Sequence, residues 1–238
     1  MTYAVDHPPG PRLGLVVLSS DETLEDEARA IMGAGLSLFH TRIECDPDVT
    51  PQTLAQMEAR MVAAARLLPE GLDAIGYGCT SASVVIGPDA VAAQMHKAHP
   101  GVPVTNPISA VVAGLHALGA RKIGLVTPYL PEVVAPMRAF LEARGIEVLA
   151  EKSFGERDDR KVARIAERST LDAMRAAAVD GVDAVFSSCT NLRSFGIIET
   201  AEADLGLPVI SSNSALLWHV ARLGGLAQVK GPGRLFET

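Results

Sequence analysis

An internal repeat constrains the fold of this chain more than any other feature of the sequence. Three pairs of segments match in order: 12–17 with 121–126, 71–80 with 181–190, and 102–104 with 207–209. The first two pairs share one register, because Gly14 matches Gly124 and Cys79 matches Cys189, each 110 residues further along. The third pair is offset by 105 residues, so the loop after Cys189 is five residues shorter than its counterpart. The chain is therefore expected to contain two copies of one unit.

Within each copy, short β-rich runs alternate with longer helical patterns, which is typical of a parallel sheet. The predicted strands are 13–18, 36–41, 74–77 and 102–104, then 123–126, 147–150, 184–186 and 209–210. The predicted helices are 24–32, 53–67, 84–98 and 109–118, then 132–143, 162–178, 197–204 and 215–223. This pattern predicts an α/β fold of two pseudo-symmetric lobes, each a parallel sheet flanked by helices. The predicted lobes are 1–118 and 119–238, with a crossing of the chain between them allowed near the C-terminus.

Charge and hydropathy limit the kinds of molecule that this chain is expected to bind. Lys and Arg number 21 against 28 Asp and Glu, which gives a net charge of −7, and there is no basic stripe, so nucleic acid is an unexpected partner. No apolar run reaches about 18 residues. The first residues also lack the pattern of a signal peptide, so we expect a cytoplasmic protein with no membrane partner. A small molecule is the expected partner.

Cysteine and glycine patterns bear on metals and cofactors. The 3 cysteines lack the close Cys or His spacing of a zinc site and are too few for a disulfide framework. The run from Gly76 to Gly78 lacks the third glycine of a dinucleotide-binding loop and the Lys of a phosphate-binding loop. We therefore expect no metal and no cofactor.

The two equivalent cysteines are the candidate catalytic residues. Ligands of parallel sheets bind at the carboxyl ends of the strands, where both cysteines fall, so both are expected to face one interlobe cleft. Backbone N–H groups at a helix start are expected to lower the thiol pKa of Cys79, and the same effect is expected at Cys189. A thiolate and a thiol on opposite sides of a substrate carbon would supply a base and an acid. The alternative is that both are buried thiols that only pack.

Polar residues beside the cysteines are candidate donors to a substrate carboxylate. They are Thr80, Ser81, Thr190 and Asn191. Tyr129 either donates a hydrogen bond to the same group or packs in the core. Asp21 and Asp159 either cap helices or bind substrate. Cys45, which has an acidic residue on each side, is predicted to be an inert loop thiol.

Three segments carry a family resemblance: 78–83 (GCTSAS), 188–192 (SCTNL) and 208–213 (PVISSN). They resemble the aspartate/glutamate racemase superfamily. Further cues at 18–25, 126–129 and 158–164 resemble its branch of maleate cis–trans isomerases, arylmalonate decarboxylases and the ectoine-utilisation protein EutA, with EutA nearest. The resemblance implies two lobes, no cofactor, one catalytic cysteine from each lobe and a homodimer.

The resemblance also implies roles for single residues. In maleate isomerases the first-lobe cysteine attacks the double bond and the second moves a proton, roles that would fall on Cys79 and Cys189. Decarboxylases typically carry glycine at the first position, so Cys79 favours isomerisation or racemisation. The isomerases carry asparagine where this chain has Asp21 and Asp159. A carboxylate there would repel a second substrate carboxylate but could pair with an ammonium group, which predicts an amino-acid substrate.

The predicted function is therefore that of a cofactor-independent isomerase or racemase that moves protons between two cysteines and a small carboxylate or amino acid. A role in the breakdown of ectoine or hydroxyectoine would fit this substrate. One alternative is maleate-type cis–trans isomerisation through an adduct on Cys79. The other is a non-catalytic, two-lobed protein that binds a small molecule.

Overall fold

The computed structural model describes residues 1–6, 10–31 and 35–238. The elements of the first half are β1 (Arg12–Leu18), α1 (Leu24–Ile31), β2 (Ser37–Ile43), α2 (Pro51–Gln56), α3 (Glu58–Ala65), β3 (Ala74–Gly78), α4 (Thr80–Ile86), α5 (Pro88–His96), β4 (Val104–Thr105) and α6 (Pro107–Ala117). Those of the second half are β5 (Lys122–Thr127), α7 (Pro131–Glu142), β6 (Glu147–Ser153), α8 (Asp159–Val162), α9 (Glu167–Ala177), β7 (Ala184–Ser187), η1 (Phe195–Ile197), α10 (Ile198–Leu205), β8 (Val209–Ser211), α11 (Ser212–Leu223) and η2 (Arg234–Glu237).

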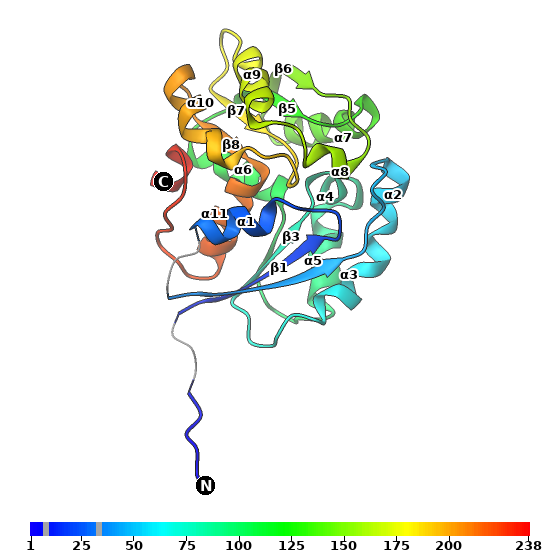
Figure 1. The fold of residues 1–238 in the computed structure, drawn as a ribbon, viewed down its shortest axis with the longest axis vertical. Coiled ribbons are helices and arrows are strands. Elements are labelled where there is room, and N and C mark those ends of the chain that lie inside the picture. Colours follow the sequence, from blue (N-terminus) through cyan, green and yellow to red (C-terminus); the bar gives the residue numbers. More distant parts are fainter. Residues whose placement is uncertain (7–9, 32–34) are drawn as a thin grey trace.

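The strands form two sheets with the same topology. Their orders are β2-β1-β3-β4 and β6-β5-β7-β8, and every neighbouring pair is parallel. Figure 1 shows one sheet in each lobe, with the first lobe below the second. The predicted fold class, two α/β lobes with parallel sheets and flanking helices, is confirmed.

Two features of the repeat have a structural cause. A carboxylate fixes the start of the first strand in each lobe: Asp73 accepts the N–H of Arg12 at 2.8 Å, and Asp183 accepts that of Arg121 at 2.9 Å. The repeated glycine of β1 and β5 leaves room for close neighbours, which are the side chains of Leu68 and Leu72 at Gly14 and the main chain at Gly124. A Cβ on Gly124 would lie 2.2 Å from the backbone oxygen of Ala177.

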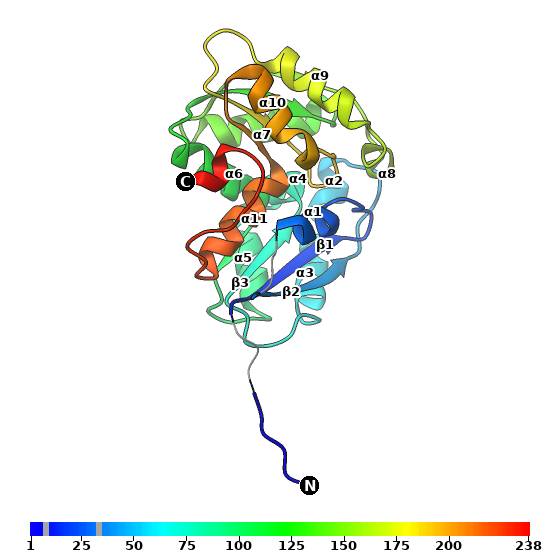
Figure 2. The ribbon, with the colours of Figure 1, turned by 60° about the vertical axis from the view of Figure 1, so that its left-hand side comes forward.

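The last helix of the second half joins the two lobes. Helix α11 packs on α6, but it also packs on β3 and β4 of the first sheet and on α1. Figures 1 and 2 show it running from β8 down to the first lobe. Side chains of α6 and β7, among them Ile108 and Phe186, share one buried cluster with residues of both lobes. Helix α11 therefore contacts elements of both halves, while the division into 1–118 and 119–238 with a crossing near the C-terminus stays a prediction.

Three predicted helices differ from those observed. The segment predicted as one helix at 53–67 forms two helices that meet at Met57. The segment predicted as one helix at 84–98 also forms two, because Gly87 has φ +93° and Pro88 follows it. The helix predicted at 162–178 is wrong in its first turn. Helix α8 ends at Val162, and the extended Ala166 redirects the chain before α9. The end predicted at residue 32 lies outside the described residues.

None of the helices in the described part of the chain is long and apolar enough to cross a membrane.

Candidate active site

Cys79 lies at the junction of β3 and α4. It is the N-cap residue of α4, with extended backbone angles, and its Sγ accepts the N–H of Ala82 at 3.4 Å. The hydroxyl of Ser81 is 3.7 Å from the same sulfur. A free helix N–H group is the usual partner of an N-cap side chain, and here a thiol takes that place. The helix begins at Thr80, four residues before the predicted start at residue 84, and Cys79 therefore stands directly at a helix start.

Cys189 follows β7 but starts no helix. Its φ is +109°, the one positive φ of a non-glycine residue in the described ranges. Its N–H donates to Ser212 Oγ at 3.0 Å, and its Sγ accepts the Tyr129 hydroxyl at 2.8 Å and the Asn191 N–H at 3.3 Å. The expectation that a helix start supports Cys189 in the same way as Cys79 is therefore wrong. The side chains of Tyr129 and Ser212, together with the main-chain N–H of Asn191, hold Cys189 instead.

Burial decides the acidity of both thiols. It raises the pKa of Cys79 to about 12, although the Ala82 N–H and the Ser81 hydroxyl act in the opposite direction. Burial also raises the pKa of Cys189 well above its ordinary value, and the charge of Asp159 adds to this. The lowered thiol pKa expected from the sequence is wrong, because loss of water outweighs the helix N-terminus. Both thiols are protonated at neutral pH in this conformation.

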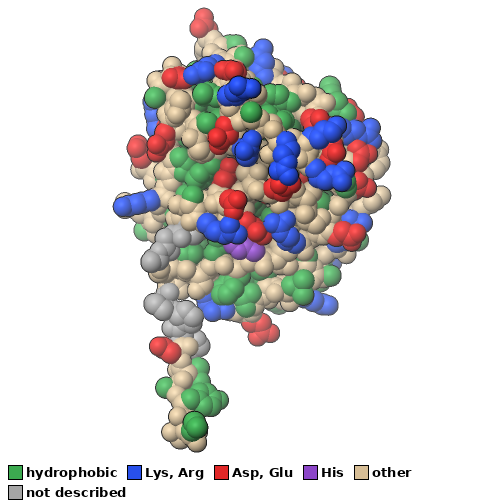
Figure 3. All heavy atoms as spheres, viewed as in Figure 1, with side chains coloured by type: hydrophobic (Ala, Val, Ile, Leu, Met, Phe, Trp, Pro, Cys, Tyr) green, Lys and Arg blue, Asp and Glu red, His purple; other side chains and the backbone are tan. Residues whose placement is uncertain are grey.

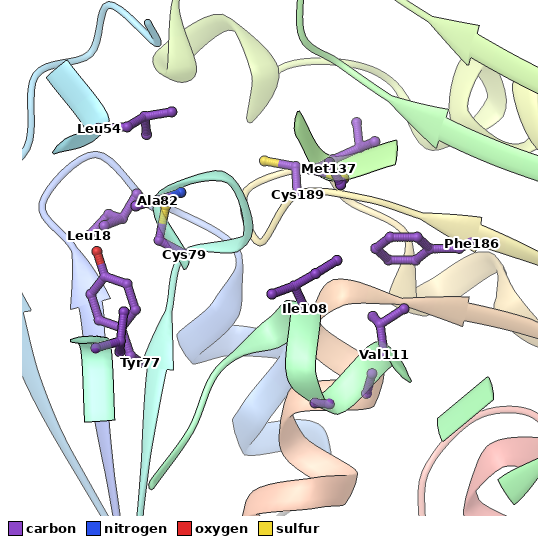
Figure 4. Close-up of a cluster of buried hydrophobic side chains, with 14 of the residues drawn as sticks. Leu18, Leu54, Tyr77, Cys79, Ala82, Ile108, Val111, Met137, Phe186 and Cys189 are labelled. Carbon is purple, nitrogen blue, oxygen red and sulfur yellow. Dashed lines mark hydrogen bonds between the residues drawn. The ribbon is translucent and has the colours of Figure 1, made fainter. Parts of the chain in front are cut away.

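Cys79 lines a small cavity between the lobes. Its other lining residues include Ser81, Tyr129 and Asp159, all expected from the sequence, and Leu54, which was not. In Figure 4 the sulfur of Cys189 points toward the side of the site on which Cys79 lies. The volume of the cavity is about 10 Å³, which is enough for about one water molecule. A substrate therefore enters only when part of the lining moves.

Cys45, which is predicted to be an inert loop thiol, also lines this cavity. Its sulfur lies 3.2 Å from the hydroxyl of Ser20 and 3.3 Å from that of Ser19. The signal that could have found it is its position just after β2, because β2 neighbours β1 and the ends of neighbouring parallel strands meet at one edge. The prediction that Cys45 is inert stays a prediction, but the thiol is part of the site wall.

Asp21 fixes the turn before α1. One carboxylate oxygen accepts the N–H groups of Thr23 and Leu24, both at 2.8 Å, so the predicted capping role is confirmed in this form. The other oxygen is buried and has no hydrogen-bond partner among the described residues. Burial, with a smaller contribution from the charge of Asp159, raises the pKa of Asp21 to about 6, although the N–H groups of Leu24 and Thr23 act in the opposite direction. An unpaired carboxylate oxygen is thus held inside the protein.

Asp159 and Asn191 connect the lobes. Asp159 accepts hydrogen bonds from the hydroxyl of Ser20 and, at 3.0 Å, from the amide of Asn191. The amide oxygen of Asn191 in turn accepts the N–H of Glu22 at 2.8 Å. Burial raises the pKa of Asp159, while its bonds to Ser20 and Asn191 lower it. The side chain of Asn191 therefore bonds within the protein rather than lining the cavity.

Two predicted hydroxyl donors also bond within the protein. Thr190 donates to the backbone oxygen of Gly78 at 3.3 Å, and Thr80 donates to Ser212 Oγ at 2.8 Å. Ser212 received no role from the sequence, although it lies in the segment 208–213 that carries the family resemblance. The structure thus places Ser81 and Tyr129 at the cavity, and Thr80 and Thr190 in contacts between loops.

Glu27 is a further residue to which the sequence analysis gave no role. Its carboxylate accepts the amide of Asn213 at 2.6 Å and the N–H of Phe195 at 3.3 Å, so α1 is joined to the second lobe. Burial raises the pKa of Glu27 to about 8, although Asn213 lowers it. An acidic residue on an amphipathic helix looks like surface from the sequence, so nothing there marked it as an interlobe contact.

The outer side of the cavity is closed by contacts between the lobes. The N–H of Val49 donates to Arg157 O at 3.0 Å, and the N–H of Asp159 donates to Pro47 O at 2.9 Å. The guanidinium of Arg157 also pairs with Asp48 through two nitrogens. On the face of the molecule that Figure 3 shows, Lys and Arg side chains lie among Asp and Glu side chains over the upper part. Within the described residues, no group of three or more His, Cys, Asp and Glu side chains could hold a metal ion.

Fold and site together define a two-lobed α/β protein with one buried cysteine from each lobe beside a single interlobe site. A family model described as arylmalonate decarboxylase matches residues 13–236. The chain is 34% identical over 240 residues to a maleate isomerase of Nocardia farcinica (strain IFM 10152), covering 95% of both chains. It is 32% identical over 236 residues to an arylmalonate decarboxylase of Bordetella bronchiseptica, covering 95% of this chain and 93% of that one.

A solved structure is similar over the same length. It is a Nocardia farcinica maleate cis–trans isomerase, a cysteine-to-serine mutant with a covalently bound succinylcysteine intermediate, with a TM-score of 0.84 and 32% identity over 95% of this chain and 98% of that one. The chain belongs to the arylmalonate decarboxylase and maleate isomerase family of the aspartate/glutamate racemase superfamily. It is accordingly an enzyme, an isomerase or a decarboxylase.

Proposed function

We propose that this enzyme is an isomerase that moves a proton between the thiols of Cys79 and Cys189 and the carbon next to a substrate carboxylate. The observation that carries the proposal is the pair of buried cysteines: Cys79 lines the cavity, and Cys189 accepts a hydrogen bond from Tyr129, which lines the same cavity. A decarboxylase needs only one of these thiols, and the family resemblance implies glycine at the first-lobe position in that case. The retained Cys79 therefore favours isomerisation or racemisation.

The reaction requires a thiolate on one side of the carbon and a thiol on the other. The thiolate takes the α proton, and the electron pair of the broken C–H bond moves into the carboxylate to give an enediolate. The opposite thiol then donates its proton to the other face of the carbon, which leaves it as the thiolate. Ser81 and Tyr129 line the cavity and supply hydroxyl donors for the charged oxygens.

The substrate class follows from the two aspartates. Asp159 lines the cavity, and Asp21 has a buried oxygen without a partner and lies close enough for its charge to interact with that of Asp159. An ammonium group would satisfy these carboxylates, whereas a second substrate carboxylate would be repelled. The same positive charge would lower the raised pKa of a neighbouring thiol. The proposed substrate is therefore a small amino acid or diamino acid, and a place in ectoine or hydroxyectoine breakdown, as in EutA, belongs to this proposal.

A second candidate is cis–trans isomerisation of a maleate-like dicarboxylate. In this reaction the thiolate of Cys79 adds to one carbon of the double bond while Cys189 gives a proton to the other. Rotation about the new single bond and the reverse elimination then yield the trans product. The covalently bound succinylcysteine of the Nocardia farcinica relative favours this route.

Proton NMR in D2O distinguishes the candidates. The purified enzyme is incubated with maleate, aspartate, glutamate and diaminobutyrate, beside the variants Cys79→Ser and Cys189→Ser. The proposal expects deuterium at the α carbon of an amino acid together with interconversion of its enantiomers, and no interconversion in either variant. Conversion of maleate to fumarate without α exchange of the amino acids would support the second candidate. No reaction with any of these compounds would overturn both.

A further inference from the structure

Ser212 is the first residue of α11 and lies between the loops of the two cysteines. Its side chain is fully buried, and its Oγ accepts two hydrogen bonds. One comes from the hydroxyl of Thr80, next to Cys79, at 2.8 Å, and the other from the N–H of Cys189 at 3.0 Å. A single oxygen atom thus touches the cysteine loops of both lobes.

The start of α11 does not by itself require this hydroxyl. In the repeat, Ser211 corresponds to Asn106, and both cap the helix that follows by accepting an N–H three residues later, at 3.0 and 3.1 Å. Ser212 corresponds to Pro107, which has neither a side-chain hydroxyl nor an N–H. The capping function is therefore present in both lobes, and the hydroxyl of Ser212 is an addition in the second lobe only.

The addition coincides with a difference between the cysteines. The N–H of Cys79 bonds within its own lobe, to Tyr77 O at 3.1 Å. Cys189 instead has φ +109°, a conformation that non-glycine residues adopt at a cost in free energy and that persists only when its surroundings fix it. Its buried N–H would be without a partner if Ser212 lacked the hydroxyl, and an unpaired buried N–H is costly.

We propose that Ser212 is a positioning residue that sets the direction of the Cys189 thiol relative to Cys79. Its oxygen holds the backbone of Cys189 in the left-handed conformation and ties it to the loop that carries Cys79. The catalytic consequence rests on the proposed two-thiol function, because the position of one thiol relative to the other matters only if both act on the same carbon.

The test compares Ser212→Ala with the matched control Ser214→Ala. Ser214 lies on the same helix, is equally buried and bonds only within the cap of α11, to Ser211. A displaced reactive group costs on the order of 100-fold in rate, so Ser212→Ala should lower kcat by about that factor and change KM little. Ser214→Ala should lower the melting temperature but leave kcat within about twofold. Ser212→Thr keeps the hydroxyl and should restore most of kcat.

A second readout does not depend on turnover. Amide hydrogen exchange followed by NMR should show the Cys189 N–H protected in the wild type and in Ser214→Ala, and exposed in Ser212→Ala. Fast exchange of this N–H in the wild type would overturn the proposal, even if Ser212→Ala did not fold. Unchanged kcat together with unchanged protection in a folded Ser212→Ala would overturn it as well. If the wild type converts no substrate, the proposed function fails, while the exchange data still decide the role of Ser212.

Discussion

Each lobe contributes one cysteine and one aspartate to the site, yet the two lobes hold these groups by different means. In the first lobe, Cys79 and Asp21 accept N–H groups of their own main chain, at the starts of α4 and α1. In the second lobe, Cys189 also accepts a main-chain N–H, from Asn191, but both it and Asp159 bond in addition to side chains from several elements. The comparison teaches that the equivalent cysteines of a repeat can keep the same chemistry while their support diverges. First-lobe groups should respond to local changes, and second-lobe groups to distant ones.

The largest expected effect concerns the pH dependence of stability set by Asp21. Its pKa is raised from 3.8 to about 6, so the folded state keeps the proton to higher pH than the unfolded state does. Asp21 therefore costs stability above about pH 6, and the cost vanishes below about pH 4. Relative to the wild type, Asp21→Asn should gain up to about 3 kcal/mol between pH 4 and 7. Urea unfolding across this range measures the difference.

Asp183→Asn is the control for Asp21 and has the opposite sign. The N–H groups of Arg121 and Lys122 lower the pKa of Asp183. Its contribution is therefore present at neutral pH and is lost as the pH falls through its folded pKa. If the difference in unfolding free energy between Asp21→Asn and the wild type stayed constant from pH 4 to 7, burial would not raise the pKa of Asp21.

The next effect concerns recognition of the substrate by the second-lobe carboxylate. Asp159→Asn removes a charge that lines the cavity, so KM for an amino-acid substrate should rise about 10- to 100-fold. Asp158→Asn is the matched control, because Asp158 is the N-cap of α8, and asparagine caps equally well. Steady-state kinetics of both variants measure the effect. Equal KM values for the two variants would remove the basis for an ammonium-bearing substrate.

A smaller effect should separate the two thiols. The Tyr129 hydroxyl donates to Cys189 at 2.8 Å and lowers its pKa, whereas the hydroxyl that lowers the pKa of Cys79 is that of Ser81. Tyr129→Phe should therefore slow alkylation of Cys189 by iodoacetamide about tenfold at a fixed pH and leave Cys79 nearly unchanged. Mass spectrometry of the labelled peptides reads both sites in one sample. Equal slowing at both cysteines would contradict the separate support of the second lobe.

The smallest effect concerns the backbone of Cys189. Glycine adopts φ +109° without strain, so Cys189→Gly should be more stable than Cys189→Ala by about 1 kcal/mol. At position 79 the backbone is extended, and an advantage of glycine over alanine there comes from helix capping instead. Urea denaturation of the two Cys189 variants provides the measurement. The reverse order at position 189 would show that the left-handed conformation there is not costly.

Much of the fold and part of the site could be predicted. The repeat predicted two equivalent lobes, and hydrophobic periodicity placed all eight strands, because both signals are local in the sequence. The same repeat marked Cys79 and Cys189 as equivalent and placed both at strand ends. The wall of the site was less accessible to prediction. Cys45 reaches it only because β2 lies next to β1, which is a fact of strand order that no local pattern contains.

The sequence alone determined which reactive and polar side chains the site can use: two matched cysteines at strand ends, hydroxyl donors after them, and two aspartates in place of amides. Only the tertiary structure decided their state. The pKa of a thiol depends on the balance between hydrogen bonds from N–H groups, which lower it, and loss of water, which raises it. At both cysteines the loss of water has the larger effect, so the pKa is raised. Whether a polar group faces substrate or its neighbours depends on contacts between lobes, which turned Thr80, Thr190 and Asn191 inward. Solvation and contacts between distant segments arise when the lobes close, so local sequence patterns do not encode them.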